Sequence, residues 1–429
     1  MSKKLLFIPL ALLLAISLIA IGCPSTTPTT TTPPTTTPPT TTPPTTTAPP
    51  AKDEIVLGQA ISLSGAYATG TLVTQLPPTD MWIEEVNNGG GLYVEEYGKK
   101  LPLRLIRYDD TSDTGTAVNL IEKLIVEDKV DFVLGPYSTA LWFATSPVFT
   151  QYHYPVVAPT VDSLQLKAMF QDIPYTFVIL NQPAEKAVSM VELAQELGIK
   201  TMVAAHHQDL HGIEYAQGVV PQLVGAGIDL LLYKSFPLDA TDLSPLLKEM
   251  KALNPDAAWF FAYPDQNILL TKQSMEIGFN PKLWYSSIGI AFSPYREIFT
   301  AAGVEGVMGA GAWNPKVPYT GAQDFWDRMT AYVGPENTDW YGNAYCYAAN
   351  QVLEQAIVET GTLDREVIRD AMATMTFDTV LGPVQFVNQF NIQSPGEVGQ
   401  WQNGEYEIIA AASKRTAQPE YPKPAWPTP

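Results

Sequence analysis

Short apolar runs alternate with amphipathic stretches through most of the chain. Four apolar runs predict buried strands, at residues 55–61, 101–108, 131–135 and 154–158. A second series with the same rhythm predicts strands at residues 201–205, 230–233, 257–261 and 283–286. The intervening stretches, such as 114–127 and 266–277, carry apolar residues at helical spacing. This alternation predicts βαβ units, parallel sheets and two doubly wound α/β lobes, with a ligand crevice at the carboxyl ends of the strands.

The N-terminal 22 residues have the pattern of a bacterial lipoprotein signal. Lys3 and Lys4 precede an almost wholly apolar run from 5 to 21, and small residues stand before Cys23. We expect cleavage before Cys23 and lipid attachment to that residue. The alternatives are an ordinary signal or a short membrane anchor, although the run is at the short end of the roughly 20 residues that a spanning helix needs.

Residues 23–50 are predicted to form a tether. After Cys23 this segment contains 15 Thr, 10 Pro, one Ser and one Ala, with no charged residue. Such a composition cannot bury a core, and proline keeps the backbone extended. The segment would hold a folded domain away from a membrane, and its threonines leave O-glycosylation open.

The net charge and the cysteine content of the chain argue against a nucleic-acid partner and against a disulfide within the fold. The chain has 429 residues, with 25 basic and 44 acidic side chains and a formal charge of -19. A nucleic-acid partner is therefore not expected, because such proteins gather Lys and Arg against phosphates. With Cys23 lipidated, Cys346 is the one remaining cysteine, so no disulfide within the fold is expected. The proline-bearing tail, 413–429, predicts little regular structure.

Several segments follow the predicted strands in a recognisable order. They are Ser62-Leu-Ser-Gly65, Tyr108-Asp-Asp-Thr-Ser-Asp113, Gly135-Pro-Tyr-Ser-Thr139, Pro155-Val-Val-Ala-Pro-Thr160 and Asp242-Leu-Ser-Pro-Leu-Leu-Lys-Glu-Met250. In this order and spacing, the chain resembles the branched-chain amino-acid (leucine/isoleucine/valine) type of periplasmic binding protein, the receptor component of ABC importers. The resemblance implies the type I fold, which has two doubly wound parallel-sheet lobes joined by a three-crossing hinge.

We place the three crossings of the hinge near 175–182, 310–315 and 379–385. Lobe 1 would then comprise 52–178 plus 314–381, and lobe 2 would comprise 179–313 plus 382–412.

The resemblance also implies a function. We expect a receptor that traps a small polar ligand, such as an amino acid, an amide or a small carboxylate, between its lobes. An ABC permease and its ATPase would be its partners, the protein would be monomeric, and no cofactor is expected. The location would be extracytoplasmic, in a periplasm or at a cell surface. The alternative is a ligand-sensing lipoprotein that reports to a separate signalling partner.

Lobe 1 supplies most of the predicted ligand contacts. In the family, the loop after the third strand holds the ligand carboxylate, and the matching hydroxyls are Ser138 and Thr139, which could equally only cap a helix. Six lobe 1 residues are predicted as ligand contacts: Tyr67, Ser138, Thr139, Trp142, Thr160 and Asp162. An ammonium contact is expected for Asp162, although this side chain could also cap a helix. Trp142 could instead belong to the core.

In lobe 2 the predicted contacts are Tyr263 and Ser287. Tyr263 matches an aromatic residue at a strand end. Ser287 stands near the register where amino-acid binders of the family often carry a Glu, and the missing Glu puts a branched-chain amino-acid ligand in doubt. Tyr285 and Trp313 are further candidates that core packing explains equally well.

Three histidines fall within six residues of one another, from 206 to 211. His206, His207 and His211 lie close together, but zinc prefers three or four suitable ligands, and a cleft-rim or solvent-exposed cluster is the preferred interpretation. The alternative for His211 is a position in the cleft. The sequence has no Gly-x-Ser-x-Gly elbow, phosphate loop or His-Glu-x-x-His motif. We therefore expect no enzyme and no metal site.

Overall fold

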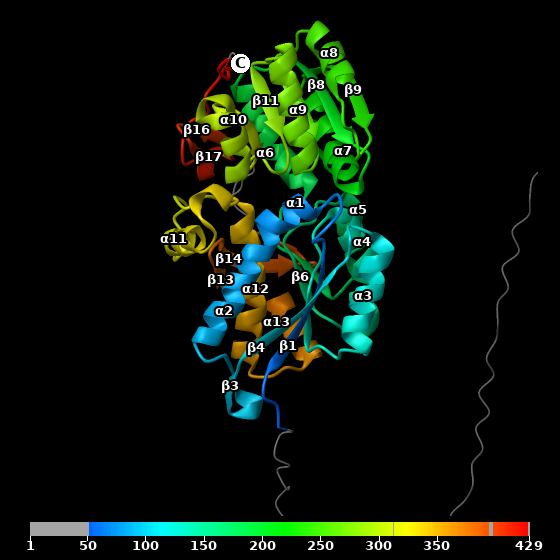
Figure 1. Ribbon diagram of the computed structural model, residues 1–429, viewed down its shortest axis with the longest axis vertical. Helices are drawn as coiled ribbons and strands as arrows, with labels where there is room; N and C mark the ends of the chain where they lie inside the picture. The colour runs from blue at the N-terminus through cyan, green and yellow to red at the C-terminus, as the bar shows by residue number, and fades with distance from the viewer. Residues whose placement is uncertain (1–50, 312, 394–397, 428–429) are drawn as a thin grey trace, which may run out of the picture. The chain divides into compact units, whose positions relative to one another are not determined.

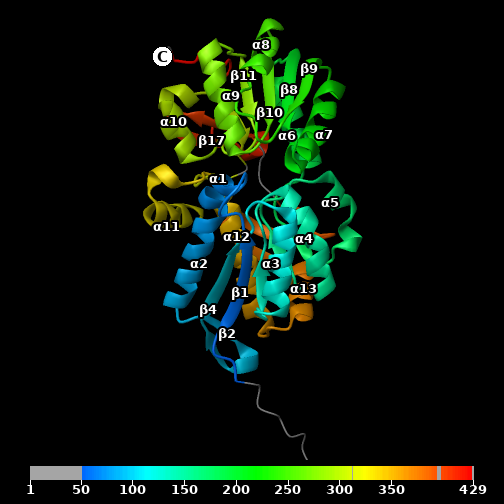
Figure 2. The same cartoon turned by 45° about the vertical axis from the view of Figure 1, so that its right-hand side comes forward.

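The structure is a computed structural model that describes residues 51–311, 313–393 and 398–427. The predicted signal, 1–22, and the predicted tether, 23–50, lie outside these residues. The described residues form a mixed α/β fold with two lobes, and each lobe has its own β-sheet structure (Figures 1 and 2).

Lobe 1 is built around a central parallel strand. Strand β1 pairs in parallel with β4 on one side and β5 on the other, and a five-stranded sheet of order β13-β14-β15-β7-β6 continues beside β5. The strands are β1 (Ile55–Ile61), β2 (Leu92–Val94), β3 (Lys99–Leu101), β4 (Leu103–Asp109), β5 (Phe132–Leu134), β6 (Val156–Ala158), β7 (Thr176–Val178), β13 (Thr376–Thr379), β14 (Gly382–Val387) and β15 (Phe390–Asn391).

Helices cover both faces of this sheet, as doubly wound packing requires. Helix α2 packs with α12 and α3 packs with α4, and the two pairs lie on opposite sides of β1 (Figure 2). The helices are α1 (Ala68–Gly70), η1 (Thr71–Gln75), α2 (Leu76–Asn88), η2 (Glu95–Tyr97), α3 (Thr114–Val126), α4 (Thr139–Tyr152), α5 (Leu164–Ala168), η3 (Phe170–Asp172), α11 (Ala322–Val333), η4 (Pro335–Asn337), α12 (Gly342–Thr360) and α13 (Arg365–Thr374).

Lobe 2 contains a seven-stranded sheet of order β17-β16-β12-β11-β10-β8-β9. Its strands are β8 (Thr201–His207), β9 (Asp229–Phe236), β10 (Ala257–Phe261), β11 (Leu283–Ser286), β12 (Met308–Ala310), β16 (Val398–Gln402) and β17 (Glu405–Ala410). Its helices are α6 (Pro183–Glu196), α7 (Leu210–Gly225), α8 (Ser244–Ala252), α9 (Pro264–Ile277) and α10 (Ser293–Val304), and η5 (Ala412–Lys414) follows β17. All five residues of β10 are buried, which explains its unbroken apolar run.

The chain changes sheet after β7, after β12 and after β15. The first two changes fall where crossings were expected. The third differs from the expectation at 379–385, because β14 and β15 pair with each other and β15 pairs with β7 of lobe 1. Segment 382–391 therefore belongs to lobe 1, and the chain re-enters the lobe 2 sheet only at β16.

Residues 415–427 of the C-terminal tail pack on lobe 2 without forming a helix or a strand. The Lys423 N–H donates to the Lys282 carbonyl at 2.8 Å, and the Trp426 ring lies 5.4 Å from that of Trp284. Burial lowers the pKa of Lys423 to about 7. This tail is thus an ordered covering of the lobe 2 core.

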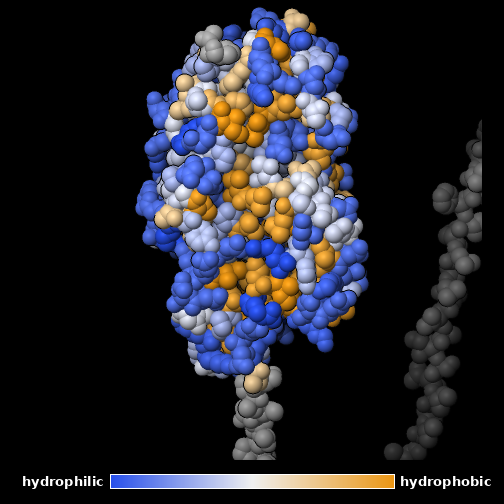
Figure 3. Space-filling model, in the orientation of Figure 1, coloured by the Kyte–Doolittle hydropathy of each residue, from blue (hydrophilic) through white to orange (hydrophobic). Residues whose placement is uncertain are grey.

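Apolar areas on the face drawn in Figure 3 lie among polar surface. Exposed large apolar side chains come from both lobes, with Leu72 in η1 and Ile298 in α10 as examples. None of the helices within the described residues has the length and apolar character needed to cross a membrane.

Candidate functional site

Loops from both lobes meet at the carboxyl ends of the strands and enclose a cavity of about 30 Å³. Its walls come from the β5–α4 and β6–α5 loops and the start of α12 in lobe 1, and from α7 and the ends of β10 and β11 in lobe 2. The lining residues are Thr74, Tyr137, Pro159, Thr160, Asp162, Leu180, His211, Tyr263, Ile288, Asp339, Tyr341, Gly342 and Tyr345. A single water needs about 10–15 Å³ on this scale, so the lobes are closed and a solute enters only if they part.

A buried ion pair joins the two lobes at this cavity. The Lys186 ammonium, on α6, donates to the Asp162 carboxylate in the β6–α5 loop, and both side chains are 3% exposed. The same ammonium lies 4.7 Å from the centre of the Tyr215 ring. Burial raises the pKa of Asp162, and the neighbouring Lys186 charge opposes that rise. Removing either partner of so deeply buried an ion pair would leave the other charge buried without compensation, which is strongly destabilising.

His211 lies against this ion pair and against Tyr263. Its Nδ1 is 3.6 Å from Asp162 Oδ2, and its ring stacks on Tyr263 with centroids 4.8 Å apart. Burial, and then the Lys186 charge, lower the pKa of His211 to about 3, so the imidazole is neutral at pH 7. Its Nε2 has no hydrogen-bond partner among the described residues. His211 therefore contributes a neutral ring to the cavity wall and keeps one buried nitrogen without a hydrogen-bond partner among the described residues.

Tyr263 and Tyr67 close the cleft from opposite lobes. The Tyr67 hydroxyl donates to Asp209 of lobe 2 at 2.8 Å, and the two tyrosine rings meet edge to face at 5.2 Å. The Tyr263 hydroxyl accepts a long hydrogen bond, 3.4 Å, from the Thr139 N–H at the start of α4. These contacts join the two lobes beside the cavity.

The loop before α4 has the caps that its sequence suggests. The Ser138 hydroxyl accepts from the Leu141 N–H at 3.2 Å, as an N-cap does. The Thr139 hydroxyl accepts from the Asp162 N–H at 3.1 Å and so fixes the loop that carries this carboxylate. Ser138 and Thr139 thus stand beside the cavity, at a helix start that favours an anion.

Two further contacts lock the lobes around α5. Glu214 of α7 accepts hydrogen bonds from the first N–H groups of α5, those of Leu164 and Gln165, at 2.6 and 3.0 Å. Gln182, in the first crossing, accepts from the Ser163 N–H at 2.9 Å. Closure is therefore held by several polar contacts besides the ion pair.

The predicted ligand residues divide into three groups. Thr160, Asp162 and Tyr263 line the cavity, while Tyr67, Ser138 and Thr139 stand beside it. Trp142 and Ser287 do not line it. The Trp142 ring is fully buried in the lobe 1 core, where a Cβ at Gly135 would lie 1.9 Å from it. The Ser287 hydroxyl is bonded at 2.9 Å to both the N–H and the carbonyl of Ala262.

The preferred interpretation of the histidines as a rim or solvent-exposed cluster is wrong for His207 and His211, whereas the alternative of a cleft position for His211 agrees with its place in the cavity wall. His207 is fully buried and His211 is 2% exposed, and only His206 is partly exposed. Among residues 51–311, 313–393 and 398–427, no three His, Cys, Asp or Glu side chains could jointly hold a metal ion.

Sequence reasoning missed Lys186, the cation of the site. A signal exists in the sequence, because the buried residues of α6 include Pro183, Lys186, Ala187 and Met190. Lys186 therefore stands in the apolar stripe of an amphipathic helix. A lysine in such a stripe is seldom buried without a charged partner.

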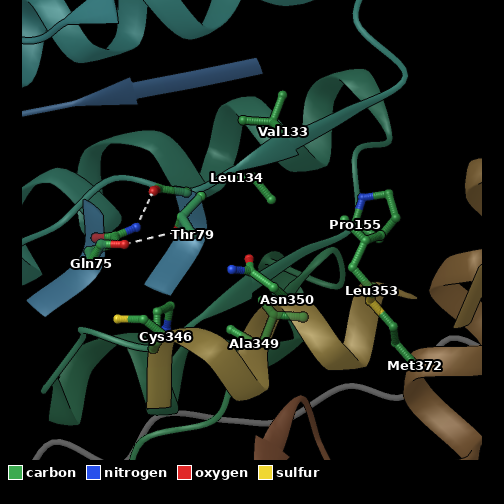
Figure 4. A pocket seen from close by; sticks show the side chains of 13 residues that line it. Gln75, Thr79, Val133, Leu134, Pro155, Cys346, Ala349, Asn350, Leu353 and Met372 are labelled. Atoms are coloured by element: carbon green, nitrogen blue, oxygen red, sulfur yellow. Dashed lines mark hydrogen bonds between the residues drawn. The ribbon is translucent and has the colours of Figure 1, made fainter. Parts of the chain in front are cut away.

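A second small cavity lies inside lobe 1, between β5, β6 and α12 (Figure 4). Its volume is about 20 Å³, and its lining includes Gln75, Thr79, Cys346 and Asn350. The Gln75 amide donates to the Gly135 carbonyl at 2.8 Å, one of the dashed bonds in Figure 4. This space has room for about one water, and unlike the cavity of about 30 Å³ it is lined by residues of lobe 1 alone.

A family model and a curated relative both match most of this chain. The model of a family described as periplasmic binding protein matches residues 54–405. A leucine-, isoleucine-, valine-, threonine- and alanine-binding protein of Pseudomonas aeruginosa is 22% identical over 309 residues, which cover 71% of this chain and 79% of that protein.

Two solved structures show the same fold. The substrate-binding protein of a branched-chain amino-acid transporter from Streptococcus pneumoniae, in complex with isoleucine, has a TM-score of 0.71 and 19% identity, covering 82% of this chain and 98% of its own. A solute-binding protein of an ABC transporter from Rhodopseudomonas palustris, in complex with 4-hydroxybenzoate, has a TM-score of 0.71 and 18% identity, covering 88% and 98%. At these identities the likeness establishes the fold.

Proposed function

The chain belongs to the periplasmic binding protein family, and on that premise we propose that it is the extracytoplasmic solute-binding receptor of an ABC importer. The single observation that carries the proposal is the cavity between the lobes, lined by polar and aromatic side chains from both. Residues from both walls can contact one small molecule at the same time. The ligand is a small polar molecule of the amino-acid, amide or carboxylate kind.

Binding works by a shift between open and closed populations. Opening breaks the Asp162–Lys186 pair and the Tyr67–Asp209 hydrogen bond, and a ligand in the cleft replaces them with contacts to both lobes. A ligand stabilises the closed form only by as much as it binds that form better. A permease then recognises the closed receptor, and its separate ATPase drives release.

The test is ligand-induced stabilisation. A library of amino acids, amides and small carboxylates is screened by thermal melting, and hits are checked by native mass spectrometry. A ligand at 100 times its Kd adds about 2.7 kcal/mol to the free energy of unfolding, which gives a clear rise in Tm. If no member raises the Tm or remains bound in the mass spectrum, the receptor proposal fails.

Attachment to the membrane through Cys23 is a further part of the proposal. It is supported by the apolar segment before this cysteine and the Thr/Pro-rich segment after it. Cys23→Ser should release the full chain from the membrane fraction into the soluble fraction, while Cys346→Ser should leave it membrane-bound. Retention of the Cys23 variant would show that the N-terminal segment anchors the protein without lipid.

A further inference from the structure

The cleft contains a cation that the contacts predicted for an ordinary amino acid do not use. Lys186 and Lys423 are the only buried Lys or Arg side chains in the described part of the chain, and Lys423 belongs to the tail site. Lys186 stands in the first turn of α6, where the helix dipole disfavours a positive charge. Helix stability therefore does not explain this lysine, and its one anionic partner is Asp162 of the opposite lobe.

Opening the cleft separates the two charges. Asp162 remains with the β6–α5 loop of lobe 1, while Lys186 remains with α6 of lobe 2. When the lobes close on a ligand whose ammonium also binds Asp162, one carboxylate has to serve two cations, the ligand ammonium and the Lys186 ammonium. A buried charge that has lost its partner is strongly unfavourable. A ligand is tightly held only if it also brings a negative group to Lys186.

The lobe 2 wall of the cavity contains two polar side chains whose hydrogen-bonding capacity is not fully used. His211 lines the cavity, is almost fully buried, and has an Nε2 with no partner among the described residues. The Tyr263 hydroxyl holds only a long bond to the Thr139 N–H, which opening would free. An unpaired buried polar atom and a weakly bonded hydroxyl beside a cation indicate a subsite for a hydrogen-bonding, charged end of a ligand.

Resting on the function proposed above, we propose that the ligand is an amino acid with a second anionic group, and that Lys186 is the residue that selects it. The carboxylate next to the ammonium binds at the start of α4, by Ser138 and Thr139. The ammonium binds Asp162, and the second anionic group binds Lys186 with His211 beside it. In the ligand-free closed form, Asp162 and Lys186 satisfy each other.

The test compares charged and uncharged probes of the same shape. Calorimetric titration at fixed ionic strength measures L-glutamate against L-glutamine and L-aspartate against L-asparagine. We expect the wild type to bind one of the dicarboxylates at least tenfold more tightly than its amide. The proposal is overturned if the amide binds as tightly, if L-leucine binds more tightly than both acids, or if none of the acids binds.

Variants assign the preference to Lys186. Lys186→Met should remove the preference for the acid over its amide, and Lys186→Arg should retain it. Lys167→Met, which removes an exposed lysine near the hinge, should behave as the wild type. Retention of the preference in Lys186→Met overturns the assignment. If Lys186→Met does not fold, the ratio of acid to amide affinity in the wild type and in Lys186→Arg still tests the proposal. Binding of a neutral ligand from the wider library would leave the receptor function standing and this ligand class refuted.

Discussion

Two ion pairs join the same two segments of the protein in opposite surroundings. Lys186 pairs with Asp162 inside the cleft, with both side chains 3% exposed. Its sequence neighbour Glu185 pairs with Lys167 of α5, and these side chains are 46% and 40% exposed. Asp162 of the inner pair lines a cavity of about 30 Å³, whereas both residues of the outer pair line a cavity of about 590 Å³. One turn of helix thus presents one charge to the interior and the adjacent one to solvent.

The difference shows what each charge can do. An exposed pair exchanges its partner for water at little cost, so it neither holds the lobes together nor discriminates between ligands. A buried pair cannot make that exchange, so whatever separates it must supply new partners. The inner pair therefore couples closure of the lobes to the charge of the ligand, and the outer pair does not.

The largest expected effect follows from removing the inner cation. Lys186→Met keeps most of the side-chain volume but leaves Asp162 buried without its partner. We expect a loss of about 3–5 kcal/mol in the free energy of unfolding, measured by urea denaturation of the ligand-free protein. The double variant Lys186→Met with Asp162→Asn should recover part of this loss. A loss below about 1 kcal/mol would mean that the lobes part easily in solution and that Asp162 is hydrated.

The second prediction concerns acid, and it contrasts buried with exposed histidines. Burial lowers the pKa of His211 to about 3 and that of His207 well below its usual 6.5. The folded state therefore binds fewer protons than the unfolded chain below about pH 6.5. Stability should be full above that pH and fall as the pH drops towards 3, by up to ~1.4 kcal/mol per unit for each proton.

Several charged or polar groups lie around His211 and set the environment in which its pKa is lowered. They are Asp162, Lys186, His207, Asp209, Tyr215 and Tyr263. The raised pKa of Asp162 acts in the opposite direction, because its contribution is lost as the pH rises through that pKa. Urea denaturation at pH 7.5 and 5.0 measures the net slope. His211→Gln should flatten it, and His153→Gln, at an exposed residue outside the cleft, should not. Equal slopes for both variants would contradict the assignment.

The alternation of strands and helices was predictable because buried parallel strands leave unbroken apolar runs. The strands predicted at 257–261 and 283–286 coincide with β10 and β11, and the helix predicted at 266–277 lies within α9. Strands β13–β17 were not predicted. Strands β13 and β14 alternate between buried and more exposed residues, so they lack the apolar runs that identify the inner strands. Strands β16 and β17 are mostly buried, but polar residues interrupt their sequences.

The candidate site was predictable only in part, for a similar reason. Asp162 and Tyr263 follow strands, and strand ends are where ligand residues gather. Trp142 and Ser287 also follow strands, yet one completes the core and the other bonds the backbone of Ala262. Lys186 lies in a helix, so a search of strand ends does not reach it. Which polar residue faces the cavity depends on packing between segments far apart in the chain.

The smallest expected effect belongs to the outer pair. Lys167→Met and Glu185→Gln each remove one exposed charge, and methionine retains apolar contact where the lysine ammonium lies 5.8 Å from the Phe390 ring centre. We expect a change of about 0–1 kcal/mol in the free energy of unfolding, which should shrink as salt screens the pair. Parallel urea titrations at low and high salt, with Lys186→Met beside them, measure both pairs under one condition. A loss in Lys167→Met equal to that in Lys186→Met would show that exposure does not separate the two pairs, and the inner pair would then have no special part in closure.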